Sequence, residues 1–353
     1  MGLSSIADSK GTAAKAVPFG LGFFLVANLY LFPWLAKSPR VTDLIGLVLL
    51  VDLVRDVITR RQRQELAAIY LTGVPAAIPL LWGAYALFRH DLSTTVLSAR
   101  WVLAVAWAYH LFAFLRNSDS RQRVLLGLFY GIVLNTAVLV FQYAGLGKTV
   151  QVLGLAPLDT KASFVYGVER MPGLHGHANP SMAVISIIVP VVISLVVLHY
   201  RGTARSFYYG AGGLAVLAVA SILTLTRSPL VVGAVTGMLG AFAVGSRRQR
   251  LLWVGVVLAG VAAVVSFSLL TGAGAHRWTD ASNIMANTGE RWGSIKASLA
   301  LVAQHPLGIG EAVRGGLLGA THNAFLQVAL IYGAVFGILI TIPFVVLAVR
   351  LVG

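Results

Sequence analysis

The residues best placed to do chemistry lie where a long polar segment meets a long apolar one near the end of the chain. Residues 271–320 form the longest break in the hydrophobicity, and His322 then opens an apolar stretch that continues to about Val349. An ionisable side chain at or near membrane depth is costly and is a functional candidate by default. Unperturbed imidazole titrates at about pH 6.5 and accepts a proton from a hydroxyl at neutral pH. His322 is therefore a candidate general base.

Two arginines precede expected helix starts on the same side as His322. Arg170 comes before a helix that Asn179 would cap, with Pro180 in its first turn. Arg227 opens the same cap-then-proline order at the next outward helix start. Helix starts present free backbone N–H groups and the positive end of the helix dipole. Because three such starts point outward, we expect an anion site on that side.

A phosphate group is the anion that this arrangement favours, since the planar guanidinium donates two hydrogen bonds to adjacent oxygens. Taken singly, an arginine of this kind is more often an interfacial side chain that reaches toward the headgroups. Arg170 and Arg227 together with the helix starts favour a shared site, which Arg291 and Arg314 of the last polar segment would join.

The histidines allow two other interpretations. His322 could bind a metal with the other histidines of the polar segments, which are His175, His177, His276 and His305. The nearby carboxylates stand in no recognised ligand pattern, and the absence of cysteine excludes thiolate sites, so we expect no metal and no cofactor. His322 could also merely anchor the last helix.

The composition predicts a polytopic membrane protein. The chain of 353 residues is 58% hydrophobic and 11% charged, whereas soluble proteins are about 25% charged. We predict an all-α membrane helix bundle of about ten transmembrane helices, the first of them an uncleaved signal anchor. The apolar segments lie near residues 17–35, 41–54, 66–87, 98–115, 124–146, 181–199, 207–225, 229–244, 251–270 and 323–348.

The net charge of +15 is a topology signal and does not indicate nucleic acid. With a cytoplasmic N-terminus, the short inner loops carry twelve basic residues and the short outer loops carry five. The inner ones are Arg55, Arg60, Arg61, Arg63, Arg116, Arg121, Arg123, Arg201, Arg205, Arg247, Arg248 and Arg250; the outer ones are Lys37, Arg40, Arg89, Arg100 and Arg227. The positive-inside rule therefore puts both termini in the cytoplasm.

This topology divides the chain into N-terminal transmembrane helices, residues 1–146, and a region 147–353 with two long outer loops at 147–179 and 271–321. Aromatic residues in both loops favour ordered segments. The Gly308 and Gly310 pair predicts a tight turn with a structural role. Buried polar residues elsewhere are explained by hydrogen bonding between helices, namely Asn28, His110, Asn135 and Gln142.

Four stretches resemble the O-antigen ligase and O-antigen polymerase superfamily of bacterial membrane glycosyltransferases. They are Arg170-x-x-Gly173 with His177-Ala-Asn179, then Thr226-Arg227-Ser228, then Arg291-Trp292 with His305-Pro-Leu-Gly308-Ile-Gly310, and last His322-Asn323-Ala-Phe-Leu followed by Gly333. Together they cover residues 170–337. Each motif is short, and it is their order and loop placement that carry the resemblance.

The resemblance implies an inverting, metal-independent transfer on the periplasmic side of the bacterial inner membrane. The donor would be a glycan on undecaprenyl pyrophosphate, and the acceptor a lipid A–core sugar in a ligase or the next repeat unit in a polymerase. Arg170, Arg227 and Arg291 would hold the pyrophosphate, and His322 would activate the acceptor hydroxyl. His177, Asn179 and Asn323 would support them.

Two rivals follow from the same residues. A surface-polysaccharide polymerase would use the same site, and a flippase of a lipid-linked glycan would bind the anion without making a bond. Transporters often show two related halves with broken helices, and no such symmetry is visible here. One departure from the resemblance is that the chain stops at Gly353, where we would expect further helices.

Overall fold

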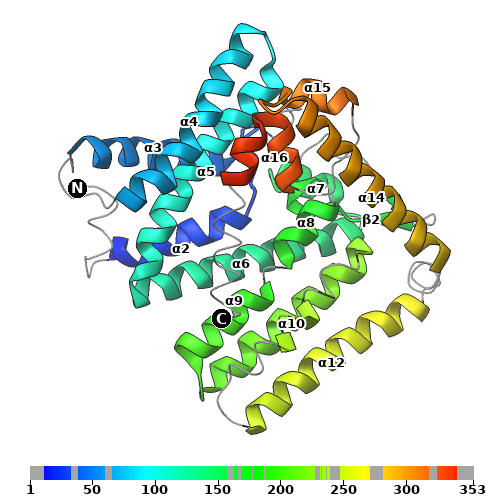
Figure 1. Ribbon diagram of the computed structural model, residues 1–353. Coiled ribbons are helices and arrows are strands. Elements are labelled where there is room, and N and C mark those ends of the chain that lie inside the picture. The colour runs from blue at the N-terminus through cyan, green and yellow to red at the C-terminus, as the bar shows by residue number, and fades with distance from the viewer. Residues whose placement is uncertain are drawn as a thin grey trace. The chain divides into compact units, whose positions relative to one another are not determined.

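The computed structural model describes residues 12–32, 39–59, 66–156, 163–165, 168–176, 178–186, 188–226, 231, 233–235, 237–238, 247–270, 281–317 and 324–339. Nearly all of these residues are helical, so the all-α prediction is confirmed (Figure 1). Within those ranges the strands are β1 (Ser163–Val165) and β2 (Val168–Arg170), a short antiparallel hairpin that pairs Ser163 with Arg170.

Helices make up most of the part of the chain that the structure describes. They are α2 (Thr12–Val26), α3 (Val41–Thr59), α4 (Leu66–Phe88), α5 (Leu92–Arg116), α6 (Ser118–Tyr143), α7 (Gly147–Val152), the 3₁₀ turn η1 (Gly173–His175), α8 (Ala178–Ile185), α9 (Ile188–Leu195), the π-helical turn η2 (Val196–Tyr200), α10 (Ala204–Thr224), α12 (Arg247–Leu270), α14 (Ala281–Gln304), α15 (Gly310–Leu317) and α16 (Ala324–Tyr332).

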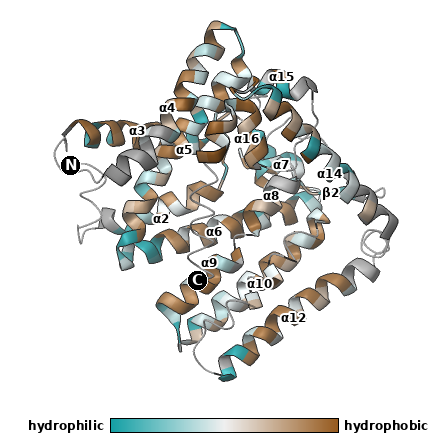
Figure 2. Cartoon of the chain, in the orientation of Figure 1, coloured by the Kyte–Doolittle hydropathy of each residue, from teal (hydrophilic) through white to brown (hydrophobic). Residues whose placement is uncertain are grey.

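Four helical segments in the described ranges are long and apolar enough to cross a membrane. They are α5, α6, the run Ser181–Tyr200 and α10. Hydrophobic residues follow the length of α6 and α12, with hydrophilic residues at their N-terminal ends (Figure 2). Length and composition thus define a helical membrane protein, while the count of ten spans stays a prediction.

The chain forms two compact units, each made of two separate stretches of sequence. The first unit comprises Met1–Ile45 and His110–Thr279, and the second comprises Gly46–Tyr109 and Asp280–Gly353. The sequence-based division at residue 146 is different, because a boundary drawn along the sequence cannot represent a unit whose parts are about 65 residues apart.

Glycines allow α2 and α6 to pack closely in the first unit. A Cβ atom at Gly22 would collide with the Val124 carbonyl oxygen, and one at Gly127 would collide with that of Phe19. Small residues at a helix contact let the two backbones approach, which is how membrane helices gain packing energy in lipid.

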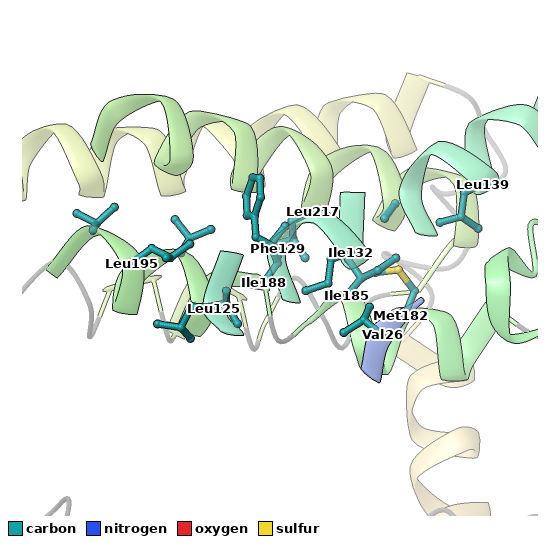
Figure 3. Close-up of a cluster of buried hydrophobic side chains, with 14 of the residues drawn as sticks. Val26, Leu125, Phe129, Ile132, Leu139, Met182, Ile185, Ile188, Leu195 and Leu217 are labelled. Atoms are coloured by element: carbon teal, nitrogen blue, oxygen red, sulfur yellow. The ribbon is translucent and has the colours of Figure 1, made fainter. Parts of the chain in front are cut away.

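The other face of α6 packs against α8, α9 and α10 around a buried hydrophobic cluster. Phe129 and Ile132 of α6 meet Met182 and Ile185 of α8 and Leu217 of α10 (Figure 3). Because these side chains are buried among helices from three parts of the sequence, they hold the first unit together.

The helix α2 ends at Val26, so the expected span 17–35 is not one continuous helix. Beyond it the Asn28 side chain donates to the Tyr30 hydroxyl at 3.2 Å, and the Tyr30 N–H donates to the Gly154 carbonyl at 2.8 Å. Tyr30 also pairs with Arg40 in an isolated β-bridge. These polar partners draw the chain out of the helix although its side chains are mostly apolar.

The second unit contains a long helix inside the segment expected to be an outer polar loop. Residues 281–304 form α14, and α15 follows after a turn. A scan for apolar runs does not detect such a helix because charged and polar residues interrupt its apolar ones. The core of this unit packs Ile331 and Phe336 against Trp82 and Trp101.

Candidate functional site

Arg170 is buried at the end of the β-hairpin and is held against the C-terminal end of α10. Its guanidinium donates from Nε to the Thr224 carbonyl at 2.7 Å and from Nη2 to the Thr226 hydroxyl at 2.8 Å. Only 6% of the residue is exposed, and burial lowers the pKa of the guanidinium. The next residue contributes as well, since the Met171 N–H donates to the Leu223 carbonyl at 3.1 Å.

These contacts give Arg170 a clear structural role. The last carbonyls of a helix lack partners within the helix, and a cation near them is stabilised by the helix dipole. α10 stops at Thr224, and Leu225 takes a left-handed conformation with φ of +49°. Arg170 thus caps α10 and lies beside Thr226, which directly precedes Arg227 in the sequence.

The turn after Arg170 is held by polar side chains from the surrounding helices. Gln142 of α6 accepts from the Gly173 N–H at 2.8 Å, and Asn135 of α6 accepts from the Leu174 N–H at 2.9 Å. The Ser181 hydroxyl of α8 donates to the Pro172 carbonyl at 2.5 Å. The sequence suggested contacts between helices for these amides, and Asn135 does donate from α6 to the Ser181 carbonyl of α8 at 3.5 Å. The same amides also fix the backbone of η1.

Gly173 has no room for a side chain in this turn. Its φ is +64°, and a Cβ atom there would lie 2.6 Å from the Ser181 Oγ and 2.7 Å from the Asn135 Oδ1. The glycine that follows Arg170 by three residues is therefore required by the close approach of three elements. We call the end of the first unit that holds the β-hairpin, η1 and the C-terminal ends of α6 and α10 the hairpin end.

His175 is the half-buried histidine of the hairpin end. Burial, and secondarily the positive charge of Arg40, lowers the pKa of His175 to about 4. Its Nε2 atom is buried without a hydrogen-bond partner in the described structure. The Arg40 guanidinium lies over the Tyr30 ring, 5.6 Å from its centroid. His175 is therefore neutral at neutral pH.

Several residues predicted for the site fall outside the described ranges, including His322, Asn323, Arg227 and His177. Asn179 lies inside α8 rather than at its N-cap, because α8 begins at Ala178. The described helix α16 begins two residues after His322.

The turn between α14 and α15 is held against α16 by backbone hydrogen bonds. The Ile309 N–H donates to the Leu330 carbonyl at 2.7 Å, and the Ala334 N–H donates to the Pro306 carbonyl at 2.8 Å. Gly308 and Gly333 have φ of +92° and +102°. A Cβ atom at Gly308 would lie 2.5 Å from the Ile331 carbonyl oxygen, so the predicted structural role of this glycine is confirmed.

The helix α16 is consequently interrupted at Gly333 and resumes at residues 334–339. At this interruption the Pro306–Gly308 turn contacts the helix. Gly333, which follows the His322-Asn323 stretch, therefore lies against the His305–Gly310 part of the third stretch. The two stretches are therefore joined within the second unit.

The two further arginines differ in their surroundings. Arg314 of α15 forms a bidentate ion pair with Glu311, at 2.6 and 2.7 Å, and this contact raises the pKa of Arg314. Its guanidinium is engaged by a carboxylate, which competes with the expected anion. Arg291 lies on an exposed position of α14 and belongs to the second unit.

Within the described ranges, no group of three histidine or acidic side chains could hold a metal ion. His305 is exposed just after α14, and His276 lies outside those ranges.

No protein-family model, curated protein or solved structure matches the chain. Its class rests on the helices described above, which make it an all-α membrane protein.

Proposed function

We propose that this protein is a membrane glycosyltransferase of the O-antigen ligase type. It would transfer a glycan from undecaprenyl pyrophosphate to a sugar hydroxyl of lipid A–core on the periplasmic face of the bacterial inner membrane. The observation that carries the proposal is the contact of Arg170 with Thr226. It joins two of the four stretches that resemble this superfamily, at one end of the first unit and next to Arg227 in the sequence.

The chemistry assigned to each residue follows from the bonds that change. The acceptor oxygen attacks the anomeric carbon from the face opposite the pyrophosphate, its proton passes to the His322 imidazole, and the bond from carbon to the pyrophosphate oxygen breaks. The leaving pyrophosphate gains negative charge, which Arg227 and Arg170 stabilise, with Arg291 as a third cation. His177, Asn179 and Asn323 support these groups, and the reaction uses no metal or cofactor.

Arg170 has two roles in this proposal. By capping α10 it fixes the residue before Arg227, and its buried positive charge adds to the field at the hairpin end. Arg227 then makes the bidentate phosphate contact. The roles of His322 and Arg227 in this proposal rest on the sequence alone, since both residues lie outside the described ranges.

The test gives purified protein both the lipid-linked glycan and lipid A–core, and follows the glycan product on a gel. We expect His322→Ala to lose about 10²–10⁴-fold in rate while it still retains the donor, because the imidazole acts on the acceptor. Arg227→Lys should lose donor binding, since an ammonium group lacks the guanidinium fork. Arg201→Lys is the matched control at an exposed position.

Each rival predicts another result in the same assay. A polymerase would extend the donor glycan into a ladder without lipid A–core, and a flippase would move the lipid-linked glycan across vesicles without joining it to anything. If His322→Ala formed as much product as the wild type, His322 would not be the general base. If excess EDTA abolished product formation, the histidines would instead bind a metal ion that the reaction requires.

A further inference from the structure

A second polar cluster lies at the opposite end of the first unit, where α6 begins, η2 ends and α10 begins. α6 and α10 run from here to the hairpin end over 26 and 21 residues, a distance of about 30–40 Å at about 1.5 Å per residue. We call this the basic end. Its cations are Arg116, Arg121, Arg123, Arg201 and Arg205, and its carboxylate is that of Asp119.

Two nitrogen atoms at the basic end are buried without hydrogen-bond partners in the described structure. They are the Nε of Arg121 and the Nε2 of His199, and the two side chains lie within electrostatic range of each other. A buried N–H group without an acceptor is costly, and almost all such groups in folded proteins find one. Because Arg121 can only donate, the atom suited to this place is an oxygen acceptor that carries negative charge.

Aromatic side chains hold this cluster in place. The Gln122 side chain donates to the Tyr200 hydroxyl at 2.7 Å, and the Tyr200 ring stacks on Tyr209 with centroids 5.1 Å apart. The Arg205 guanidinium lies 5.8 Å from the centroid of the Tyr200 ring. Tyr200 closes the π-helical turn that carries His199, and such turns are frequent at functional sites.

We infer that the basic end binds a phosphate group, and that this phosphate belongs to the headgroup of an anionic phospholipid. Arg121, His199 and Arg205 would be the donors, from α6, η2 and α10. The lipid source is favoured because Phe207 and Tyr208, at the start of α10, are 59% and 70% exposed beside these cations. Aromatic residues next to basic ones are typical of the headgroup level, where basic pockets between helices bind anionic lipids.

Asp119 is the group that opposes this binding. It is exposed, and its backbone N–H is held by the Asn117 cap at 2.9 Å. A single exposed carboxylate among five arginines leaves the basic end strongly positive, so an anion is favoured.

The test measures lipid retention by native mass spectrometry of purified protein titrated with phosphatidylglycerol or with phosphatidylcholine. We expect phosphatidylglycerol to be retained and to bind roughly 10- to 100-fold more weakly to Arg121→Gln, the range expected for a lost hydrogen bond to a charged group. Arg123→Gln is the charge-matched control, because it removes the same charge from an exposed position two residues along the same helix. It should weaken binding less than Arg121→Gln, since it lowers the net charge without removing a proposed donor.

A second variant and a competition distinguish the remaining outcomes. If Arg121→Gln does not fold, as judged by circular dichroism and size exclusion, His199→Leu takes its place with the same expected loss. Equal binding of the two lipids, or an equal loss in Arg123→Gln, overturns the proposal. If inorganic phosphate binds at the basic end and phosphatidylglycerol does not, the lipid assignment is wrong. None of these readouts depends on transferase activity.

Discussion

At the scale of single residues, Arg170 shows why a functional arginine and a structural one are hard to separate. Both interpretations predict that a substitution abolishes activity, but only the cap predicts a loss of stability. We expect Arg170→Lys to lower the free energy of unfolding by roughly 1–3 kcal/mol, because lysine cannot reach the Thr224 carbonyl and the Thr226 hydroxyl together. Thermal unfolding in detergent measures it, with Arg201→Lys as the exposed control. An unchanged unfolding midpoint would show that the guanidinium does not cap α10.

The lowered pKa of His175 predicts how the stability of the protein depends on pH. Burial, with a smaller contribution from Arg40, holds its folded pKa at about 4, whereas an unfolded histidine titrates at about 6.5. Between these two pKa values the unfolded state binds more protons than the folded state. The free energy of unfolding is therefore highest above about pH 6.5 and falls as the pH is lowered toward 4. The upper limit of this loss is about 3 kcal/mol.

We expect His175→Gln to flatten the fall of the thermal midpoint between pH 7 and pH 4, the window given by these two pKa values. The exposed His305→Gln should keep the slope of the wild type. Identical slopes in the wild type and in His175→Gln would mean that the imidazole is not buried as a neutral group.

At the scale of elements, the turn η1 depends on a glycine for two separable reasons, its left-handed backbone and the lack of space. Gly202 offers a matched control, since its φ is +77° and nothing lies within 4 Å of a Cβ atom built there. We expect Gly202→Ala to cost about 1 kcal/mol, the usual penalty for a left-handed alanine, and Gly173→Ala to cost clearly more. Chemical denaturation measures both. Equal losses would mean that Asn135 and Ser181 move aside without cost.

The sequence was sufficient to predict the helices that are formed by continuous apolar runs. α6 and α10 were expected from such runs, and the glycine turn at Gly308 from its residue types. Asn28 shows the limit, because it lies just beyond the end of α2 inside an apolar run, where its amide donates to the Tyr30 hydroxyl and to the Leu174 carbonyl 146 residues away. α14 was not expected as a helix, because charged and polar residues interrupt its apolar ones and leave no apolar run of spanning length.

The candidate site could be predicted only as a set of residue types. The order of motifs selected Arg170, but its partners lie at the last residue of α10 and just beyond it, 54 and 56 residues away. Likewise, the amides that hold η1 come from α6. Such contacts depend on the packing of helices, and local sequence carries no signal for them.

At the scale of the whole molecule, the two ends of the first unit make the topology testable. The chain has no cysteine, so a single introduced cysteine is the only thiol in the protein that a labelling reagent can modify. We expect Lys148→Cys, exposed in α7 at the hairpin end, to react with an impermeant thiol reagent in whole cells. Ser118→Cys, exposed at the start of α6, should react only after lysis, as the positive-inside rule requires. The reverse pattern would overturn the topology and the proposed mechanism together.

The close contact of α2 with α6 also has a consequence for biosynthesis. Gly22 leaves the ribosome 102 residues before Val124, its partner in the packed pair, and α3, α4 and α5 are made in between. At about 5–20 residues per second, α2 exists for about 5–20 seconds before the surface that covers it has been synthesised. The described part of α2 is 15 residues long, fewer than the about 20 that cross a membrane, and Gly22 leaves its contact surface without a side chain. During this interval the insertion machinery or lipid must cover the surface of α2 that α6 later occupies, and that surface is open to wrong partners until α6 has been made.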